Sequence, residues 1–565
     1  MFGARTRGDL ASRLVEVAGW STATRDDGLV ARTVAETRAV DRVYTLGESA
    51  FFDELFAYLR EIGVFTLLED LTPQDGRRRS YPFLASVLIT MMRCIGGVES
   101  QLATHDLLLT DEGLMSLVGF NATQVQGGAS KRGLSQRKRP VAIRGAISYE
   151  TVADNIVRIG KDKLAAMLNG IVSALAAQGQ LDKVIDVVLD GTDDEATPKY
   201  KTDDGRPVPS VLREKRPSVR ANGHAPKVKV TVWGWKIWAV WEPSAKLPLA
   251  IVIDDINVHD NKHALSVLQQ AKRNVSPHAR IRSVALDRGF LDGKLLGAIG
   301  REGMLIYIPA RSDMTIAKDA RALARLAKQE AAKGRPVDNC TVARRDHERK
   351  RGAGKNATTQ TRLTEVVHIR DLHCDWWEHG SSSKRHSKHF EPQCVHATVV
   401  LCWDGARAEV DEEVVLLSTD PDKDPFAAFD AYDERSKIEN TCNREAKERW
   451  FLEHHPKRSE AGMRVHAYFV FASMALVTGF RAHRAAADEQ ERRGQHTGIG
   501  RYRRALELQN RDKVAVFIDD RFGIYRSWEL LLLLGVSVRE RADMGESAAT
   551  VLARYGAPSA RRDSS

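Results

Sequence analysis

The chain has 565 residues and an ordinary globular composition, with 43% hydrophobic and 28% charged residues. This composition argues against a collagen-like, disordered or coiled-coil protein, and the length predicts several domains. Lysine and arginine total 85 against 75 aspartate and glutamate residues, which gives a formal net charge of +10. A large basic protein usually meets a polyanion, either nucleic acid or an anionic membrane surface.

A membrane-spanning protein is not predicted. A spanning helix needs about 20 consecutive apolar residues, whereas the best apolar stretch, Ala467–Phe480, is shorter and follows Arg464 and His466. We interpret it as a buried core helix. The N-terminus is charged and lacks the apolar segment of a signal peptide. The six cysteines form no CxxC pair, which favours reduced, intracellular thiols.

The first part of the chain is predicted to be helical. Apolar residues recur at three- and four-residue spacing in Phe51–Ile62 and Phe83–Met92. We expect residues 1–123 to form a helical N-terminal region that is a candidate for DNA binding, although it carries no clear helix-turn-helix signature. Residues 124–180 are predicted to be a basic loop, broken by glycine and proline, and a helical linker.

The pattern then changes to strands, which are rich in β-branched and aromatic residues. The expected strands are Lys183–Asp190, Val228–Trp241, Leu249–Asp254, Arg282–Asp287 and Leu305–Pro309. Helical stretches, His263–Arg273 and Leu291–Glu302, separate the last three strands. Three strands followed by helix, strand, helix and strand predict a mixed α/β sheet, which we place in residues 181–311.

Residues 312–412 interrupt this pattern and are predicted to be a partly β insertion into the α/β domain. Helices resume at Asp430, and we expect residues 413–484 to complete that domain. A C-terminal region, residues 485–565, contains a polar linker and a further strand and helix.

Two aspartates end predicted strands. Asp190 is followed by Gly-Thr, and Asp287 by Arg-Gly-Phe. Functional groups in open α/β sheets lie at the carboxyl ends of strands, and a nearby glycine lets the backbone turn away from the carboxylate. The plainer alternative is an aspartate that caps a turn or helix. Asp186 competes with Asp190, because both face the same side of a strand, but the Gly-Thr context favours Asp190.

A third carboxylate lies on a predicted helix. Tyr432, Arg435 and Glu439 are spaced by three and four residues, so they share one helix face. This combination suits phosphodiester chemistry. The carboxylate can bind a divalent metal, and the guanidinium and the phenol can hold nearby phosphate oxygens. The alternative is a solvated helix face with one ion pair.

The sequence resembles the DDE transposases of bacterial insertion sequences, in the branch with a Y-x2-R-x3-E-x6-K signature. The resemblance covers about residues 180–480. It rests on three motifs in this order, namely Asp190-Gly191-Thr192, Asp287-Arg288-Gly289-Phe290, and Tyr432, Arg435, Ile438 and Glu439. The large separation of Asp287 from Glu439 is similar to the β-rich insertion of that branch.

The last position of the signature departs from the family. The expected lysine position holds Ala446, and Lys447 follows one residue later. On a regular helix this places Lys447 about 80° round from Glu439. The long lysine side chain or a π-bulge would restore its position, and Arg444 is another stand-in.

The resemblance implies an RNase H-like mixed sheet with a large insertion, preceded by the helical N-terminal region. It implies that Asp190, Asp287 and Glu439 are the catalytic residues and hold two Mg²⁺ or Mn²⁺ ions, which suits all-oxygen ligation. Two ions about 4 Å apart activate the nucleophile and stabilise the leaving oxygen. Water then frees a 3′-OH at the transposon end, and this 3′-OH attacks target DNA.

Further residues are candidates for DNA contact. The resemblance assigns phosphate contacts to Tyr432, Arg435 and Lys447, and base stacking to Trp376 or Trp377. The alternative for the tryptophans is a local hydrophobic contact. The basic loop offers further phosphate contacts, unless it is only a solvated loop; its candidates are Lys131, Arg132, Arg137, Lys138 and Arg139. The His/Cys-rich stretch around Trp376 is irregularly spaced, which favours a polar loop over a zinc site.

The expected function is therefore a transposase that cleaves transposon ends and joins them to target DNA. Its partners would be double-stranded DNA, both terminal repeats and target, and a second copy of the chain on that DNA. We expect a cytoplasmic, nucleoid-associated bacterial protein. Two alternatives stay open, an RNase H-like endonuclease without joining activity and a catalytically inactive, transposase-derived DNA-binding protein.

Overall fold

The computed structural model describes most of the chain, namely residues 24–74, 81–121, 124–125, 145–215, 228–351, 358–374, 393–404, 412–420, 424–438, 442–487 and 499–556. The chain forms two compact units. The first unit comprises Met1–Ile171, Thr202–Asp204 and Trp450–Ser565, and the second comprises Val172–Lys201 and Gly205–Arg449.

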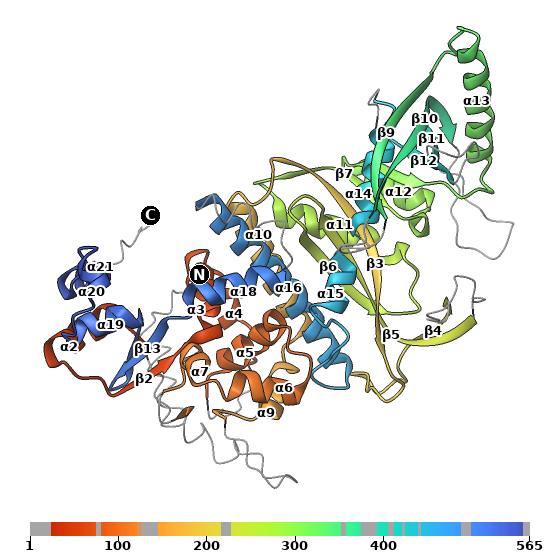
Figure 1. Cartoon of the computed structure of the whole chain (residues 1–565). Helices are drawn as coiled ribbons and strands as arrows, with labels where there is room; N and C mark the ends of the chain where they lie inside the picture. Colours follow the sequence, from red (N-terminus) through yellow and green to blue (C-terminus); the bar gives the residue numbers. More distant parts are fainter. Residues whose placement is uncertain are drawn as a thin grey trace. The chain divides into compact units, whose positions relative to one another are not determined.

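The second unit is built on one mixed sheet, in which the described residues form ten strands (Figure 1). The strands are β3 (Val184–Ala196), β4 (Ser210–Lys215), β5 (Val228–Glu242), β6 (Leu247–Asp255), β7 (Arg280–Leu286), β8 (Leu305–Pro309), β9 (Cys340–Arg351), β10 (Thr358–Cys374), β11 (Gln393–Asp404) and β12 (Glu412–Ser418). Their order is β4-β5-β3-β7-β8-β12-β11-β10-β9, and β4 and β6 pair with successive parts of β5.

The centre of this sheet has the RNase H-like arrangement that the resemblance implies. Strand β5 is antiparallel to both β6 and β3, whereas β7 runs parallel to β3 and β8 runs parallel to β7. Val187, Val188 and Leu189 in β3 are almost fully buried, as expected for a central strand covered on both faces. The predicted fold class is confirmed.

Helices cover this sheet. Helix α11 (Asn261–Val275) joins β6 to β7 and packs on β5, β6 and β7. Helix α12 (Gly293–Arg301) joins β7 to β8 and follows the short helix η3 (Arg288–Phe290). Helix α14 (Ala427–Ile438) contacts β3, β7 and β8, and α15 (Arg444–Glu448) follows it.

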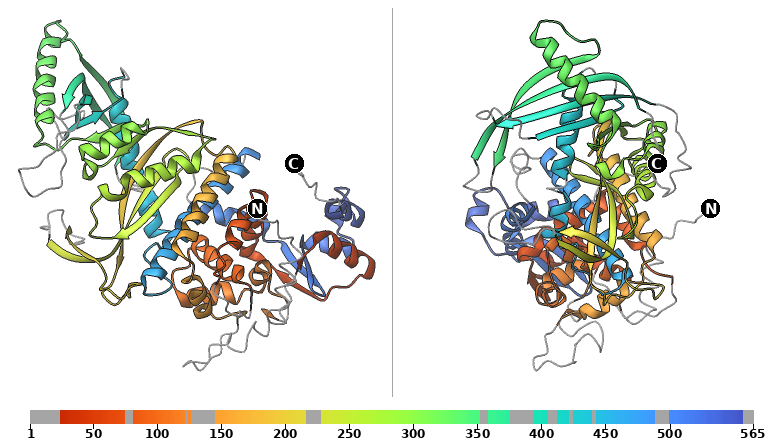
Figure 2. Two further views of the ribbon diagram at one scale, coloured as in Figure 1. Left: turned by 180° about the vertical axis from the view of Figure 1, so that it is seen from behind. Right: turned by 90° about the vertical axis from the view of Figure 1, so that its right-hand side faces the viewer.

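The insertion continues the central sheet. After β8 the chain forms α13 (Thr315–Ala332) and then the antiparallel strands β9 to β12. Strand β12 returns beside β8, with Leu416 opposite Pro309. Helix α13 lies against β9, β10 and β11 (Figure 2). Lys328 of α13 and Arg344 of β9 both pair with the fully buried carboxylate of Glu365 in β10, which fixes the helix on its sheet.

The first unit is mainly helical. Its helices are α2 (Asp27–Thr37), η1 (Gly47–Ser49), α3 (Ala50–Glu61), α4 (Val64–Glu69), α5 (Phe83–Gly96), α6 (Gln101–Thr104), η2 (His105–Leu109), α7 (Glu112–Val118), α9 (Tyr149–Ile156), α16 (Glu460–Ala487), α18 (Ile499–Asn510), α19 (Ser527–Leu533), α20 (Arg539–Ala542) and α21 (Ala548–Gly556). Helix α10 (Lys161–Ala177) begins in this unit and ends in the second.

Helix α16 contains the long apolar stretch of the sequence. By length and composition it could cross a membrane, but 89% of its most apolar window is buried inside the protein. Such burial is typical of the core helix of a globular protein. Helix α16 packs on α5, where Cys94 Sγ lies 3.9 Å from His466 Nδ1. Burial raises the pKa of Cys94 to about 12, so this thiol stays protonated.

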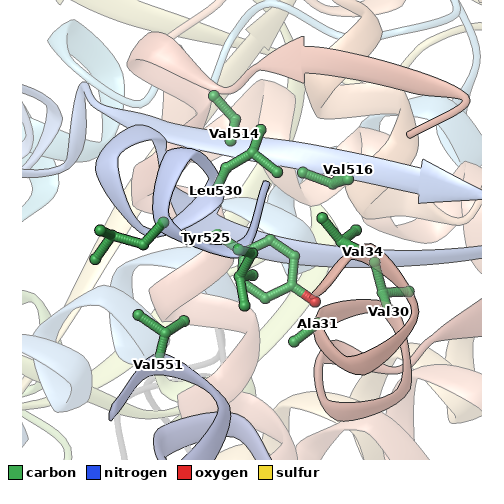
Figure 3. Packing of buried hydrophobic residues seen from close by; sticks show 10 residues of the cluster. Val30, Ala31, Val34, Val514, Val516, Tyr525, Leu530 and Val551 are labelled. Atoms are coloured by element: carbon green, nitrogen blue, oxygen red, sulfur yellow. The ribbon is translucent and has the colours of Figure 1, made fainter. Parts of the chain in front are cut away.

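The two ends of the chain share a small sheet in the first unit. Strands β1 (Thr24–Arg25) and β2 (Arg42–Thr45) flank the hairpin of β13 (Lys513–Ile518) and β14 (Arg521–Arg526). We call this sheet with α2, α19 and α21 the terminal module. Its core draws on both ends of the chain (Figure 3) and comprises Val30, Ala31, Val34, Val514, Val516, Tyr525, Leu530, Leu532, Leu533 and Val551.

A glycine in β5 allows that strand to lie against β3. Gly234 has a φ of 138°, and a Cβ atom there would lie 2.1 Å from the carbonyl oxygen of Asp194. We expect Gly234→Ala to lower the free energy of unfolding by at least about 1–3 kcal/mol, because both the backbone conformation and the contact become unfavourable. Urea denaturation of the two proteins measures this difference.

The matched control is Gly300→Ala in α12, where an added Cβ meets no atom within 4 Å. Alanine there should leave stability unchanged or raise it by up to about 1 kcal/mol. A Gly234→Ala protein as stable as the parent would mean that β5 does not need this conformation.

Candidate functional site

The register of β3 and β7 brings the two predicted aspartates together. Leu189 of β3 is the partner of Leu286 in the parallel strand β7. Asp190 and Asp287 are the next residues along the two chains, so they leave the paired segment side by side. Neighbouring strands lie about 4.8 Å apart, and residues in matching register face the same side of the sheet. The two carboxylates therefore share one face of the sheet. Asp287 follows the end of β7, whereas β3 continues to Ala196, so Asp190 lies within its strand and does not end it as the sequence predicted.

Asp190 is held by two neutral donors. Its Oδ1 accepts a hydrogen bond from the backbone N–H of Gly191 at 2.9 Å, and its Oδ2 accepts one from Asn443 Nδ2 at 2.7 Å. Asn443 lies just before α15 and is 7% exposed. This residue was not predicted from the sequence. The signal that could have found it is its position four residues after Glu439, which is one helical turn.

Asp287 faces the other predicted residues. Its Oδ1 accepts from the backbone N–H of Arg288 at 2.7 Å and begins η3, and its Oδ2 lies 3.7 Å from Arg435 Nη2. Arg435 is buried, and its guanidinium also lies 3.4 Å from the Tyr432 hydroxyl oxygen and over the Tyr432 ring. The structure thus brings Tyr432, Arg435 and Asp287 together.

Lys447 reaches β3 after a π-helical turn. Residues 442–443 have π-helical hydrogen bonding immediately before α15. Lys447 Nζ donates a hydrogen bond at 2.5 Å to the carbonyl oxygen of Asp193, three residues beyond Asp190. A π turn inserts one residue into the helix, which accounts for a lysine one position later than in the family signature.

Lys236 and Asp260 form an ion pair next to the glycines of the two aspartate motifs. The Asp260 carboxylate lies close to both glycines: a Cβ added at Gly191 would lie 3.8 Å from its Oδ1, and one added at Gly289 would lie 3.0 Å from its Oδ2. Lys236 Nζ of β5 donates to Asp260 Oδ1 at 2.7 Å and to the Val258 carbonyl at 2.9 Å. The glycines of both motifs thus leave room for the Asp260 carboxylate, which was not predicted from the sequence either.

The competing aspartate of β3 is engaged in structural contacts. Asp186 accepts hydrogen bonds from Arg282 Nε at 2.9 Å and from Ser283 Oγ at 2.6 Å. Burial alone would raise the pKa of Asp186, but these hydrogen bonds lower it below its ordinary value. Asp193 forms a bidentate pair with Arg213 of β4. Both carboxylates have cationic partners of their own, which supports the preference for Asp190.

Several predicted residues lie outside the described part of the chain. They are Glu439, Trp376, Trp377, Lys131, Arg132, Arg137, Lys138 and Arg139. Their roles stay predictions.

The two aspartate side chains fit a hard divalent cation. Asp190 and Asp287 offer carboxylate oxygens, which Mg²⁺ and Mn²⁺ prefer, and each carboxylate has about four lone-pair sites. Within the described residues, no three histidine, cysteine or acidic side chains are grouped closely enough to hold a metal ion. The two aspartates would therefore need a further ligand from outside those residues.

Comparisons with known proteins show the family of the chain. A family model described as "Transposase DDE domain" matches residues 185–476, slightly more than half of the chain. Among solved structures, a cryo-EM structure of a piggyBac transposase synaptic complex with hairpin DNA is similar, with a TM-score of 0.34 and 9% sequence identity, over 79% of this chain and 75% of that chain. Among proteins with curated descriptions, none matches.

The Lys236–Asp260 pair predicts an asymmetric effect of mutation. The Lys236 side chain is 7% exposed and that of Asp260 is 37% exposed. Asp260→Ala leaves a buried ammonium without its counter-charge and should cost about 3–5 kcal/mol of unfolding free energy. Lys236→Met leaves a half-exposed carboxylate that water can solvate, so it should cost less.

Urea denaturation of the two single variants and the double variant measures this difference. The double variant should be more stable than Asp260→Ala alone, because it removes the unpaired buried charge. A larger loss for Lys236→Met than for Asp260→Ala would contradict this account of the pair.

Proposed function

Because the chain belongs to the transposase DDE domain family, whose function is DNA transposition, we propose that it cleaves transposon ends and joins the freed 3′-OH to target DNA. Members of this family generally use divalent metal ions and act on DNA. We further propose that the ions are two Mg²⁺ or Mn²⁺, and that the chain acts as a homodimer on paired transposon ends.

The register of β3 and β7 is the observation that supports this proposal most strongly. It sets Asp190 beside Asp287 on one face of an RNase H-like sheet. Arg435 approaches Asp287, and Asn443 contacts Asp190. Glu439 lies midway between Arg435 and Asn443 in the sequence, four positions from each. This position supports Glu439 as the third carboxylate.

The residues of the site divide into two roles. Asp190, Asp287 and Glu439 would hold the metal ions, which when bound lower the pKa of the attacking group and offset charge on the leaving oxygen. Arg435 and Tyr432 would contact a DNA phosphate next to Asp287, since a planar guanidinium matches phosphate oxygens. Lys447, at the other end of the same helical segment, would also contact a DNA phosphate.

A strand-transfer assay tests the proposal. The purified chain is incubated with end DNA of its own element, a plasmid target and Mg²⁺ or Mn²⁺. We expect joined product from the parent protein, and at least about a 1,000-fold loss in Asp190→Asn, Asp287→Asn and Glu439→Gln. Losing a metal ligand removes several kcal/mol of transition-state stabilisation, and each 1.4 kcal/mol is about tenfold in rate.

Each outcome of this assay has a distinct meaning. Asp338→Asn, an exposed carboxylate in the insertion, is the control and should keep full activity. Cleaved ends without joined product would favour the endonuclease. DNA binding without cleavage would favour the inactive DNA-binding protein. Full activity in Glu439→Gln would remove Glu439 from the site.

The basic loop is proposed to contact DNA phosphates, which predicts a change in salt dependence. Replacing Lys131, Arg132, Arg137, Lys138 and Arg139 by glutamine should weaken binding to end DNA and to unrelated DNA alike. The slope of log affinity against log salt should become shallower by about 0.9 for each phosphate that the protein no longer neutralises. Fluorescence anisotropy at several salt concentrations measures this slope. An unchanged slope would show that the loop is only solvated.

A further inference from the structure

We propose that Asn443 is a positioning residue of the site, whose amide holds Asp190 in the orientation that binds metal. This inference rests on the proposed function, because it assigns Asn443 a role toward the metal ligand Asp190. Neither the family signature nor the predicted residues include this position.

The contact is specific and buried. Asn443 Nδ2 donates to Asp190 Oδ2 at 2.7 Å, and the asparagine is 7% exposed. Its own Oδ1 is buried and has no hydrogen-bond partner among the described residues. An asparagine placed only for packing would satisfy both ends of its amide, because a buried polar atom without a partner is destabilising. The contact with Asp190 therefore accounts for the placement of this amide.

A neutral donor suits a metal ligand. A carboxylate that binds a cation must keep its charge and a lone pair that can face the metal while its side chain stays in one rotamer. The backbone N–H of Gly191 and the amide of Asn443 each bond one oxygen of Asp190 and together fix the plane of its carboxylate. An amide does this without adding a positive charge that would compete with the metal.

The π turn gives Asn443 this position. It covers Cys442 and Asn443, and α15 begins at the next residue. Asn443 and Lys447 are one helical turn apart and therefore share a face. Both contact β3, Asn443 at the Asp190 carboxylate and Lys447 at the Asp193 carbonyl oxygen. The two contacts fasten this face of the helix to the strand that carries the first aspartate.

The test measures metal binding and joining separately. Mn²⁺ is titrated into the full-length chain bound to end DNA, and free Mn²⁺ is followed by electron paramagnetic resonance. Asn443→Leu keeps the shape of the side chain without its donor, and Asn443→Ala removes the side chain. Both should weaken Mn²⁺ binding by about 10- to 100-fold, as expected when a residue that orients a ligand is lost.

Activity should respond in a way that a purely structural role would not produce. Strand transfer by both variants should need more Mn²⁺ for half-maximal rate, and saturating Mn²⁺ should restore part of the rate. Gln329→Ala, which removes an exposed amide from α13, is the matched control and should change neither measurement. The thermal unfolding temperature of each variant shows whether it is folded, and Asn443→Ala replaces Asn443→Leu if the larger side chain prevents folding.

The failure of this inference differs from the failure of the proposed function. Parent-like Mn²⁺ affinity and metal dependence in a folded Asn443 variant would overturn the positioning role, while the parent protein still joined DNA. A parent protein that joins no DNA would overturn the proposed function. The Mn²⁺ titration would in that case still decide whether Asn443 supports a metal site.

Discussion

The pairing of β3 with β7 is the constraint on which the site depends. Because the strands are parallel and Leu189 is paired with Leu286, the two aspartates that follow occupy equivalent positions on neighbouring strands. A slip of one residue in either strand would turn its aspartate to the opposite face. The register is protected by burial, since Val187, Leu189, Val284 and Leu286 are almost fully buried. The buried residues of β3 and β7 therefore set the relative position of the two aspartates.

The helical segment after β12 places one side chain next to each of the two aspartates. Arg435 near the end of α14 lies beside Asp287, and Asn443 before α15 contacts Asp190. One aspartate thus has a buried guanidinium at 3.7 Å and the other a neutral amide at 2.7 Å. The guanidinium beside Asp287 carries a positive charge, whereas the amide beside Asp190 is neutral.

Much of the α/β core could be predicted because its signals are local. The strand Leu305–Pro309 has the predicted bounds. Asp190 and Asp287 were proposed from the glycines that follow them, and the strand register places these two aspartates side by side. The contacts of Asn443 and Asp260 are not local in the sequence. Asn443 meets Asp190 across 253 positions of the chain, and Asp260 approaches Gly289 only through tertiary packing. The short strands β1 and β2 carry too few residues for a period to show.

The terminal module folds only after both ends of the chain have been synthesised. The backbone N–H of Ile524 donates to Asp27 Oδ1 across 497 positions, and Tyr525 donates to the Asp27 carbonyl oxygen. During synthesis α2 and β2 leave the ribosome long before the strands that pair with them exist. Contacts between such distant segments form late, because the intervening chain must first be ordered. A protein cut short near its end would therefore leave its own beginning without a partner.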